Sequence, residues 1–168
     1  VAAIANNKVE VKVKEEVEAS LIDFTIVEKG TTTEVELKDL VKESAKVFVL
    51  ETEALVGGKA YTLTSNGKSV NFTGIAADKS APKVVKVSAV DTNTFDVEFS
   101  DKMDFATTTN ASNYKVDKDL NVVKVELNSA RKVATITTDA AKRGMLYTIT
   151  IEGVLNSDGV AMTKSSHK

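Results

Sequence analysis

Apolar and polar residues alternate with a period of two along much of the chain. Val9, Val11 and Val13 alternate with lysine and glutamate between residues 8 and 14, and residues 95–99 read Phe-Asp-Val-Glu-Phe. A period of two is typical of a β-strand that buries one face and exposes the other. The pattern therefore predicts an all-β fold.

Further short segments have strand character and are separated by turn signals such as Asn66-Gly67. One helical turn is predicted over residues 39–44, because Leu37, Leu40 and Val41 would share a helix face. Residues 100–112 are predicted to form a long polar loop, and residues 165–168 a polar tail. The predicted strands cover residues 8–14, 21–27, 33–37, 46–50, 61–64, 69–72, 83–90, 95–99, 114–116, 122–127, 133–137, 146–151 and 160–162.

The two halves of the chain repeat each other. Residues 9–13 match residues 95–99, and Tyr61–Thr64 matches Tyr147–Thr150, both 86 positions later; residues 35–37 match residues 125–127, 90 positions later. This period is too long for a solenoid repeat but fits a duplicated small domain. Many short strands with frequent turns are typical of an immunoglobulin-like sandwich. We therefore predict two tandem immunoglobulin-like β-sandwich domains, residues 1–78 and 79–168.

A short extended linker is predicted between these domains. Pro82 is the only proline, and it closes the stretch Ala76–Pro82. Proline fixes φ and favours extended geometry in the residue before it. In the repeat register Val1 corresponds to Val87, so the first strand of the first domain is expected to be truncated. With Val1 rather than Met at the start, we expect a two-domain slice of a longer array.

One run in the second half resembles a known family. Residues 94–104 read TFDVEFSDKMD, Asn113–Val116 follow as Asn-Tyr-Lys-Val, and the link before them is Asp78–Val84. These segments resemble the bacterial Ig-like domains of surface-layer (S-layer) proteins. The likeness covers nearly all of the second domain, whereas the first departs from it at Lys14–Glu18. It implies an extracellular, structural role at the bacterial cell surface, in the S-layer.

Composition narrows the classes of function. The formal net charge is −2, which gives no electrostatic reason to expect nucleic acid as a partner. No apolar run is long enough for a membrane helix, so membrane insertion is not expected. The chain has no cysteine and one histidine, and its acidic residues mostly alternate with lysines. No nucleophile–base set or carboxylate pair is visible, and the chain is not expected to be an enzyme.

Calcium is the one cofactor that the sequence suggests. Asp101 and Asp104 lie in one loop beside Ser100, and Asp78 lies in the linker. Calcium binds carboxylate and carbonyl oxygens, and many S-layer proteins, which the chain resembles, need calcium to assemble. The alternative is that these residues only form turns, as Asp commonly does in polar loops.

These observations predict a structural module of an S-layer array that self-assembles through domain contacts and is stiffened by calcium. The expected partners are neighbouring domains and copies of the same protein, and a cell-wall polymer bound through regions outside this chain. The alternative is an adhesin, or a carbohydrate-binding or spacer module of a secreted surface protein or enzyme. Carbohydrate-binding sandwiches usually expose aromatic residues, but the chain has no Trp and few other aromatics.

Overall fold

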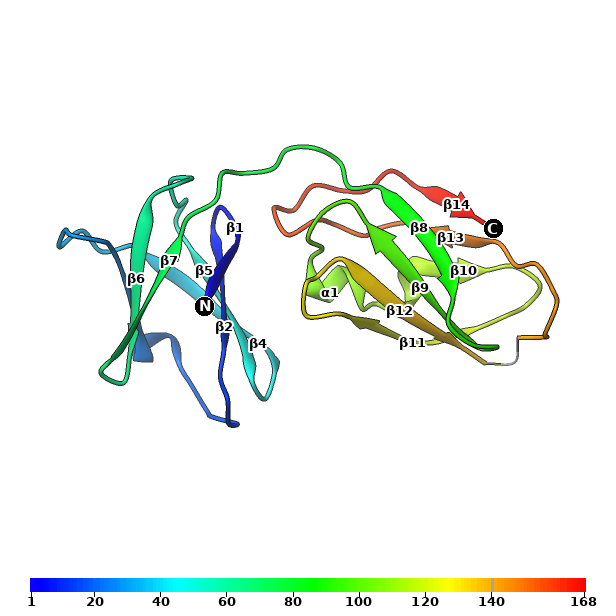
Figure 1. Ribbon diagram of the computed structural model, residues 1–168, viewed down its shortest axis with the longest axis horizontal. Helices are drawn as coiled ribbons and strands as arrows, with labels where there is room; N and C mark the ends of the chain where they lie inside the picture. Colours follow the sequence, from blue (N-terminus) through cyan, green and yellow to red (C-terminus); the bar gives the residue numbers. More distant parts are fainter. Residues whose placement is uncertain (140) are drawn as a thin grey trace. The chain divides into compact units, whose positions relative to one another are not determined.

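The computed structural model describes residues 1–139 and 141–168 (Figure 1). The chain divides into two compact units, Val1–Asp78 and Lys79–Lys168, each with its own buried apolar cluster. Strands dominate both units, and the helical segments described are short: η1 (Leu21–Asp23), α1 (Phe105–Thr108) and η2 (Ala111–Asn113). The prediction of an all-β chain of tandem immunoglobulin-like sandwiches is confirmed.

The first unit contains two antiparallel sheets. One has the strand order β1-β2-β5-β4 and the other the order β3-β6-β7. Their inward side chains form the apolar core, in which Val9 and Leu50 are fully buried. The strands are β1 (Ala2–Ala5), β2 (Lys8–Lys12), β3 (Phe24–Glu28), β4 (Leu37–Ser44), β5 (Val47–Thr52), β6 (Ala60–Ser65) and β7 (Lys68–Thr73).

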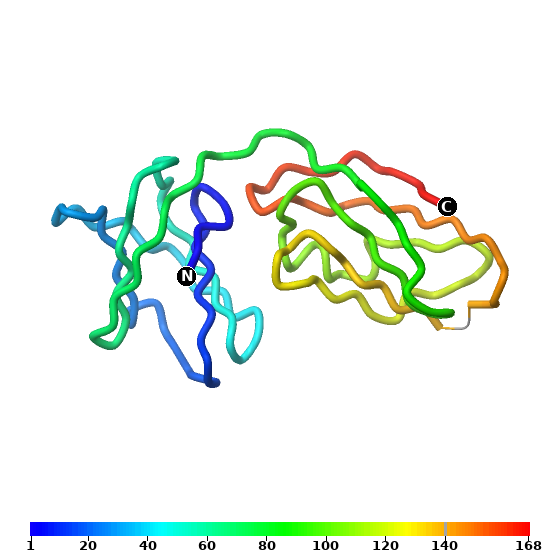
Figure 2. The backbone as a smooth tube through the Cα atoms, viewed as in Figure 1, coloured from blue at the N-terminus to red at the C-terminus, as the bar shows by residue number. Residues whose placement is uncertain are grey.

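The second unit repeats this arrangement. Its sheets have the orders β11-β12-β9-β8 and β10-β13-β14, and β14 follows β13 at the chain's C-terminal end (Figure 2). Val97, Ile136 and Ile151 are fully buried in its core. The strands are β8 (Val84–Ala89), β9 (Thr94–Phe99), β10 (Tyr114–Val116), β11 (Val122–Leu127), β12 (Val133–Thr138), β13 (Ile149–Ile151) and β14 (Ser165–His167).

Strand pairing in the two units follows the same register. Val9 pairs with Leu50 in the first unit, and Phe95 pairs with Ile136 in the second, each 86 positions later. Such register is strongly specified wherever one strand face is buried, because a one-residue slip would expose the core face. The repeat in the sequence is therefore also a repeat in the structure.

The predicted helical turn over residues 39–44 is wrong, because these residues belong to strand β4. Register shifts between Leu37 and Asp39 and between Lys42 and Ser44 each add a residue to the strand. An added residue stretches the apolar spacing from two to three, which resembles helical spacing. Leu37 lies opposite Thr52, as Val122 lies opposite Thr138, so matching residues 35–37 to 125–127 is wrong as well.

The predicted polar tail is also wrong in part. Ser165–His167 form strand β14, which pairs with β13. The segment is polar because it is an edge strand, and Thr150 Oγ1 and Ser166 Oγ lie 2.9 Å apart across the pair. Residues 160–162, predicted as the last strand, contribute only an isolated bridge between Leu155 and Ala161.

The edge strands of both four-stranded sheets are irregular. Each of β1, β4, β8 and β11 contains at least one register shift of the β-bulge kind. Bulges bend and twist a strand, and natural proteins use them to keep exposed edges from pairing with other chains. No helix in the described part of the chain is long and apolar enough to cross a membrane.

Candidate functional site

Asp104, one of the predicted calcium ligands, caps the short helix α1. Its Oδ2 accepts hydrogen bonds of 3.0 Å from both the backbone N–H and the hydroxyl of Thr107. An aspartate at this position satisfies a backbone donor that the helix itself leaves without a partner. The carboxylate therefore has a structural function in the loop.

Asp101 also has a structural role in this loop. Its Oδ2 accepts a 2.6 Å hydrogen bond from the hydroxyl of Ser100, and Ser100 Oγ in turn accepts one of 2.9 Å from the backbone N–H of Lys83. This chain of bonds ties the loop to the entry of β8. The structure thus places Asp101 and Asp104 in one loop of the second unit.

Asp78 is the last residue of the first unit and is half-buried. Across residues 1–139 and 141–168, no three acidic or histidine side chains gather in a group that could hold a metal ion. Calcium bound at the Asp101–Asp104 loop would therefore take its remaining ligands from carbonyl oxygens and water, which it accepts. The calcium site stays a prediction.

The two neighbouring asparagines hold the same loop together. Asn110 Oδ1 accepts from the backbone N–H of Ser112 at 3.1 Å. Asn113 Nδ2 donates to the carbonyl oxygens of Thr107 at 2.7 Å and Gly153 at 3.3 Å. The polar residues of this loop thus satisfy one another's backbone groups, as expected of a stable connection between strands.

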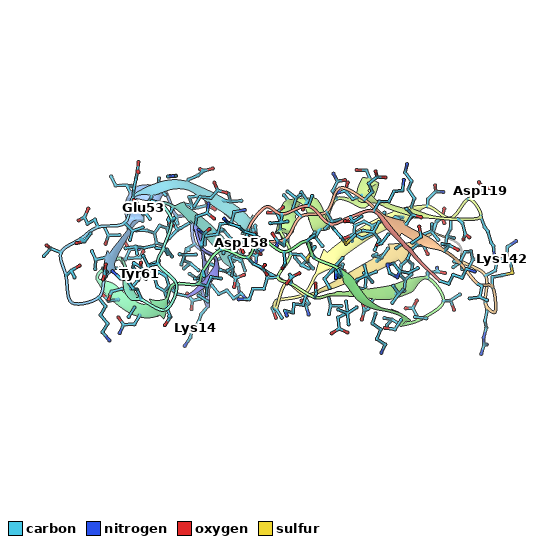
Figure 3. All side chains as sticks on the ribbon, turned by 90° about the horizontal axis from the view of Figure 1, so that it is seen from above. Lys14, Glu53, Tyr61, Asp119, Lys142 and Asp158 are labelled. Carbon is cyan, nitrogen blue, oxygen red and sulfur yellow. The ribbon has the colours of Figure 1, made fainter. Side chains whose placement is uncertain are left out.

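Each unit contains a tyrosine that fixes a turn to a late strand. The hydroxyl of Tyr61 accepts a 2.9 Å hydrogen bond from the backbone N–H of Val56, and the hydroxyl of Tyr147 accepts one of 2.8 Å from Lys142. Tyr61 lies inside the first unit, and Lys142 lies near Asp119 at one end of the second (Figure 3). Both turns contain a glycine at positive φ, Gly58 and Gly144, a conformation that glycine adopts without steric cost.

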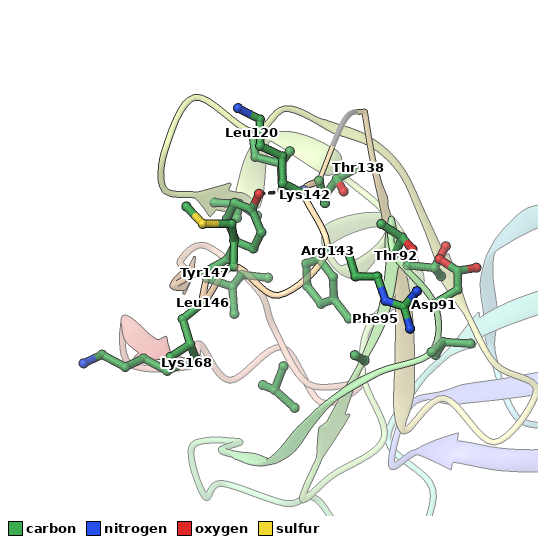
Figure 4. A pocket seen from close by; sticks show the side chains of 18 of the residues that line it. Asp91, Thr92, Phe95, Leu120, Thr138, Lys142, Arg143, Leu146, Tyr147 and Lys168 are labelled. Atoms are coloured by element: carbon green, nitrogen blue, oxygen red, sulfur yellow. Dashed lines mark hydrogen bonds between the residues drawn. The ribbon is translucent and has the colours of Figure 1, made fainter.

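A cavity of about 640 Å³ opens beside Tyr147 at this end of the second unit. Its floor is apolar and includes Val87, Phe95 and Ile149, whereas lysine and arginine side chains stand at its rim (Figure 4). Asp91 is the one side-chain carboxylate among the described residues that line it. A pair of carboxylates, which glycoside hydrolysis usually needs, is therefore not assembled by these residues.

Local hydrogen bonds and burial shift the pKa of three side chains in the second unit. A backbone hydrogen bond from Thr148 lowers the pKa of the Asp117 carboxyl, and a hydrogen bond from Lys164 lowers the pKa of Glu152. Burial raises the pKa of the Tyr114 hydroxyl. These shifts move away from neutrality, whereas a general acid or base works best with a pKa near the working pH.

The fold and these corners define a pair of immunoglobulin-like sandwiches. No family model matches the chain, and no curated protein matches it. Among solved structures, domains 1–6 of the surface layer protein SbsC match at 29% identity and a TM-score of 0.50, over 52% of this chain and 13% of that chain. The resemblance to S-layer domains drawn from the sequence is confirmed.

Two further matches, also to structures of SbsC, each cover 98% of this chain. The N-terminal part of the bacterial S-layer protein SbsC matches at 19% identity and a TM-score of 0.44, over 98% of this chain and 42% of that chain. The S-layer protein rSbsC matches at 15% identity and a TM-score of 0.49, over 98% of this chain and 24% of that chain. The chain therefore spans less than half the length of each of these S-layer structures.

Proposed function

We propose that the chain is a structural module of a bacterial S-layer and acts outside the cell, at its surface. The observation that carries this proposal is the likeness of half the chain to SbsC domains, at 29% identity and a TM-score of 0.50. In this role the two sandwiches act mechanically: each packed core is a rigid body, and repeated bodies extend the layer.

Contacts between copies would run through side chains rather than through new strand pairs. The four bulged edges oppose strand addition to the larger sheets. Exposed ion pairs such as Lys124–Glu126 at 2.8 Å on β11, and Lys164–Glu152 at 2.9 Å beside the ends of β14 and β13, show that the strand faces and strand ends carry both signs of charge. Such faces suit polar lateral contacts that weaken as salt screens them.

Immunogold labelling of thin sections of the source cells, with antibodies against this chain, tests the location. The proposal predicts dense label over the whole cell envelope and a regular spacing of the label on isolated envelope fragments. Label confined to the cytoplasm, or only to the culture medium, would contradict it.

Sedimentation velocity of the purified chain tests self-association. We expect the sedimentation coefficient to rise with protein concentration and to fall again in about 0.5 M NaCl, where the Debye length is only a few ångströms. A single monomeric species at every concentration and salt level would exclude assembly through this part of the protein.

We further propose that calcium stiffens the pair of units. Small-angle scattering with excess calcium and with chelator measures this directly, because a stiffer pair gives a narrower distribution of intramolecular distances. Identical profiles in the two conditions would remove calcium from the mechanism and leave the structural proposal in place.

The carbohydrate-binding alternative has less support. Every Phe and Tyr of the chain lies in the described part, and each is buried or half-buried, whereas sugar rings are usually bound by stacking on exposed aromatic faces. Binding to a glycan array by a chain that stays monomeric would favour this alternative over the S-layer proposal.

A further inference from the structure

The two units carry formal charges of opposite sign. Val1–Asp78 contains 13 acidic and 9 basic residues, a formal charge of −4, whereas Lys79–Lys168 contains 11 acidic and 13 basic residues, a formal charge of +2. Complementary charge steers two surfaces together and disfavours contacts between surfaces of like charge. The first unit of one copy is therefore expected to attract the second unit of another copy.

Three acidic residues of the first unit line a groove of about 460 Å³. The groove lies beside β3, the edge strand of one sheet, and the first residue of β4, the edge strand of the other. Its carboxylates belong to Glu34, Glu36 and Glu53, all of them exposed (Figure 3). Among the described residues no lysine or arginine lines this acidic groove. It therefore suits a basic side chain.

The acidic groove has an apolar floor and fixed walls. Its floor consists of Phe24, Ile26, Val35 and Leu37. The backbone N–H of Val35 donates to the carbonyl oxygen of Ile26 at 2.8 Å, and that of Glu53 donates to Glu36 at 2.9 Å. These bonds tie the segment that carries the carboxylates to both sheets. The groove is thus already formed in the free chain, as binding sites usually are.

The second unit carries the sequence Val-Val-Lys-Val at both edges of its larger sheet. It occupies residues 84–87 in β8 and residues 122–125 in β11. In both copies of the sequence the register shifts, so that the second valine has no partner in the neighbouring strand. A bulge of this kind re-aims a side chain. Val85 is accordingly 62% exposed and Val123 63% exposed.

Charge distinguishes the β8 edge from the β11 edge. Residues 79–90, which include β8, contain three lysines and no acidic residue. Two of these, Lys83 and Lys86, are exposed on either side of Val85 along the chain. Glu98 lies opposite Lys86 in the neighbouring strand. Two ammonium groups against one carboxylate leave the β8 edge positive.

The β11 edge has the same valine but no excess of positive charge. Residues 118–127, which include β11, contain two lysines and two acidic residues. Lys124, which follows Val123, forms an ion pair of 2.8 Å with Glu126. The two edges therefore differ in charge while sharing a sequence and a bulge, and charge complementarity to the acidic groove selects the β8 edge.

We propose that the β8 edge of one copy docks into the acidic groove of a second copy. Lys86 enters the groove with its apolar stem along the floor and its ammonium group at the carboxylates, as lysine side chains allow, and Val85 packs on the rim. Each chain has one β8 edge and one acidic groove, so the contact is heterologous and continues from copy to copy. This inference rests on the proposed self-association and names its surfaces.

Mixing two variants tests the contact. The groove variant carries Glu34→Lys and Glu36→Lys, and the edge variant carries Lys83→Gln and Lys86→Gln. In sedimentation velocity at about 0.01 M NaCl, where the Debye length is about 30 Å, each variant alone should stay monomeric. An equal mixture should form dimers that grow no further, because each variant supplies the surface that the other lacks. Dimer formation also shows that both variants are folded.

A mixture that stays monomeric, or a variant that alone associates like the parent, would overturn the proposal. If the parent associates with concentration and all variants do the same, only this contact is wrong and the S-layer proposal stands. If the parent itself is monomeric, both this contact and self-association through this chain are excluded, and the labelling of the cell envelope still tests the location.

The repeated sequence offers a matched pair of valine variants. Val85→Ser should weaken the association of the parent about tenfold, because an exposed valine no longer becomes buried in the contact. Val123→Ser, at the same bulge of the other edge, is the control and should leave the association unchanged. Equal weakening by the two variants, or a larger effect of Val123→Ser, would overturn the assignment to the β8 edge.

Discussion

Hydrogen bonds between one side chain and the backbone stabilise several turns of this protein, and the side chain is often a tyrosine. Tyr61 and Tyr147 accept hydrogen bonds from turn backbones, whereas Tyr114 donates one of 2.8 Å to the carbonyl oxygen of Thr108. Buried hydroxyl groups of this kind are stable only while they are paired. The stability of the second unit should therefore respond to the protonation of Tyr114.

We expect the second unit to lose stability as the pH rises above about 10. Burial raises the pKa of Tyr114 from its ordinary value of 10.0. Above that value the unfolded chain releases the phenolic proton and the folded chain retains it, so the free energy of unfolding falls with pH. Melting temperatures between pH 8 and 11 check this.

Tyr114→Phe is the control, because it removes the titrating group. Its melting temperature should be lower at pH 8, by the equivalent of about 1 kcal/mol for the lost hydrogen bond. Its further decline toward pH 11 should be shallower than that of the parent. Parallel declines would assign the alkaline loss to other groups.

Thr108→Val should stabilise the second unit. The Thr108 Oγ1 atom is buried and makes no hydrogen bond with any described residue, and an unsatisfied buried hydroxyl costs about 1–3 kcal/mol. Valine has nearly the same shape and no such group. A rise in the midpoint of urea unfolding is expected.

Thr107→Val is the matched control in the same helix. Thr107 Oγ1 donates to Asp104 at 3.0 Å and accepts from the backbone N–H of Leu155 at 3.2 Å. Its loss should lower the urea midpoint, in the opposite direction to Thr108→Val. If both variants were destabilised, the buried hydroxyl of Thr108 would not be the costly group.

Among the elements, the strands that the sequence failed to predict show where local pattern is insufficient. The alternation around Val9 and Val97 predicts β2 and β9 because these strands are regular and bury one face. Strand β4 was not predicted, because its two bulges space the apolar residues as a helix would. Strand β14 was not predicted, because an edge strand needs few apolar residues. Both are defined by their partners rather than by their own residues.

The candidate sites were predicted only in part, because they too depend on partners that are distant in the sequence. Asp101 and Asp104 are recognisable as loop carboxylates, but their hydrogen-bond partners depend on the folded loop. The cavity beside Tyr147 was not predicted, because its lining comes from segments that lie far apart in the sequence. One signal was available: at the repeat distance, Leu55 is matched by the much smaller Ala141.

Variants of Asp104 distinguish its role as a helix cap from its predicted role as a calcium ligand. Without calcium, Asp104→Ala should lose about 1 kcal/mol of unfolding free energy, while Asp104→Asn, which also caps a helix, should lose little. If calcium binds at this loop, added calcium should raise the melting temperature of the parent and raise that of Asp104→Asn less.

Asp101→Ala is the comparison for the two Asp104 variants. Its partner is the hydroxyl of Ser100, so without calcium the change should cost less than that of Asp104→Ala. A melting temperature that calcium leaves unchanged in the parent and in every variant would reject the site at Asp101 and Asp104.

For the whole molecule, we propose that the two units fold independently. Each has its own core, and the fully buried Leu50 and Ile136 occupy equivalent positions in β5 and β12. Truncating either to alanine should cost about 2–5 kcal/mol. Calorimetry should therefore show that Leu50→Ala lowers one transition and Ile136→Ala the other. A single transition that both variants lower equally would show that the units unfold together.

The bulges in β1, β4, β8 and β11 have a consequence for crowding. A protein that coats a surface is held at very high local concentration, where flat open β edges would fuse neighbouring molecules into amyloid-like ribbons. Kinked borders on the larger sheets remove that route. In the proposed layer, dense packing would therefore stay reversible, and a misplaced molecule could detach and dock again.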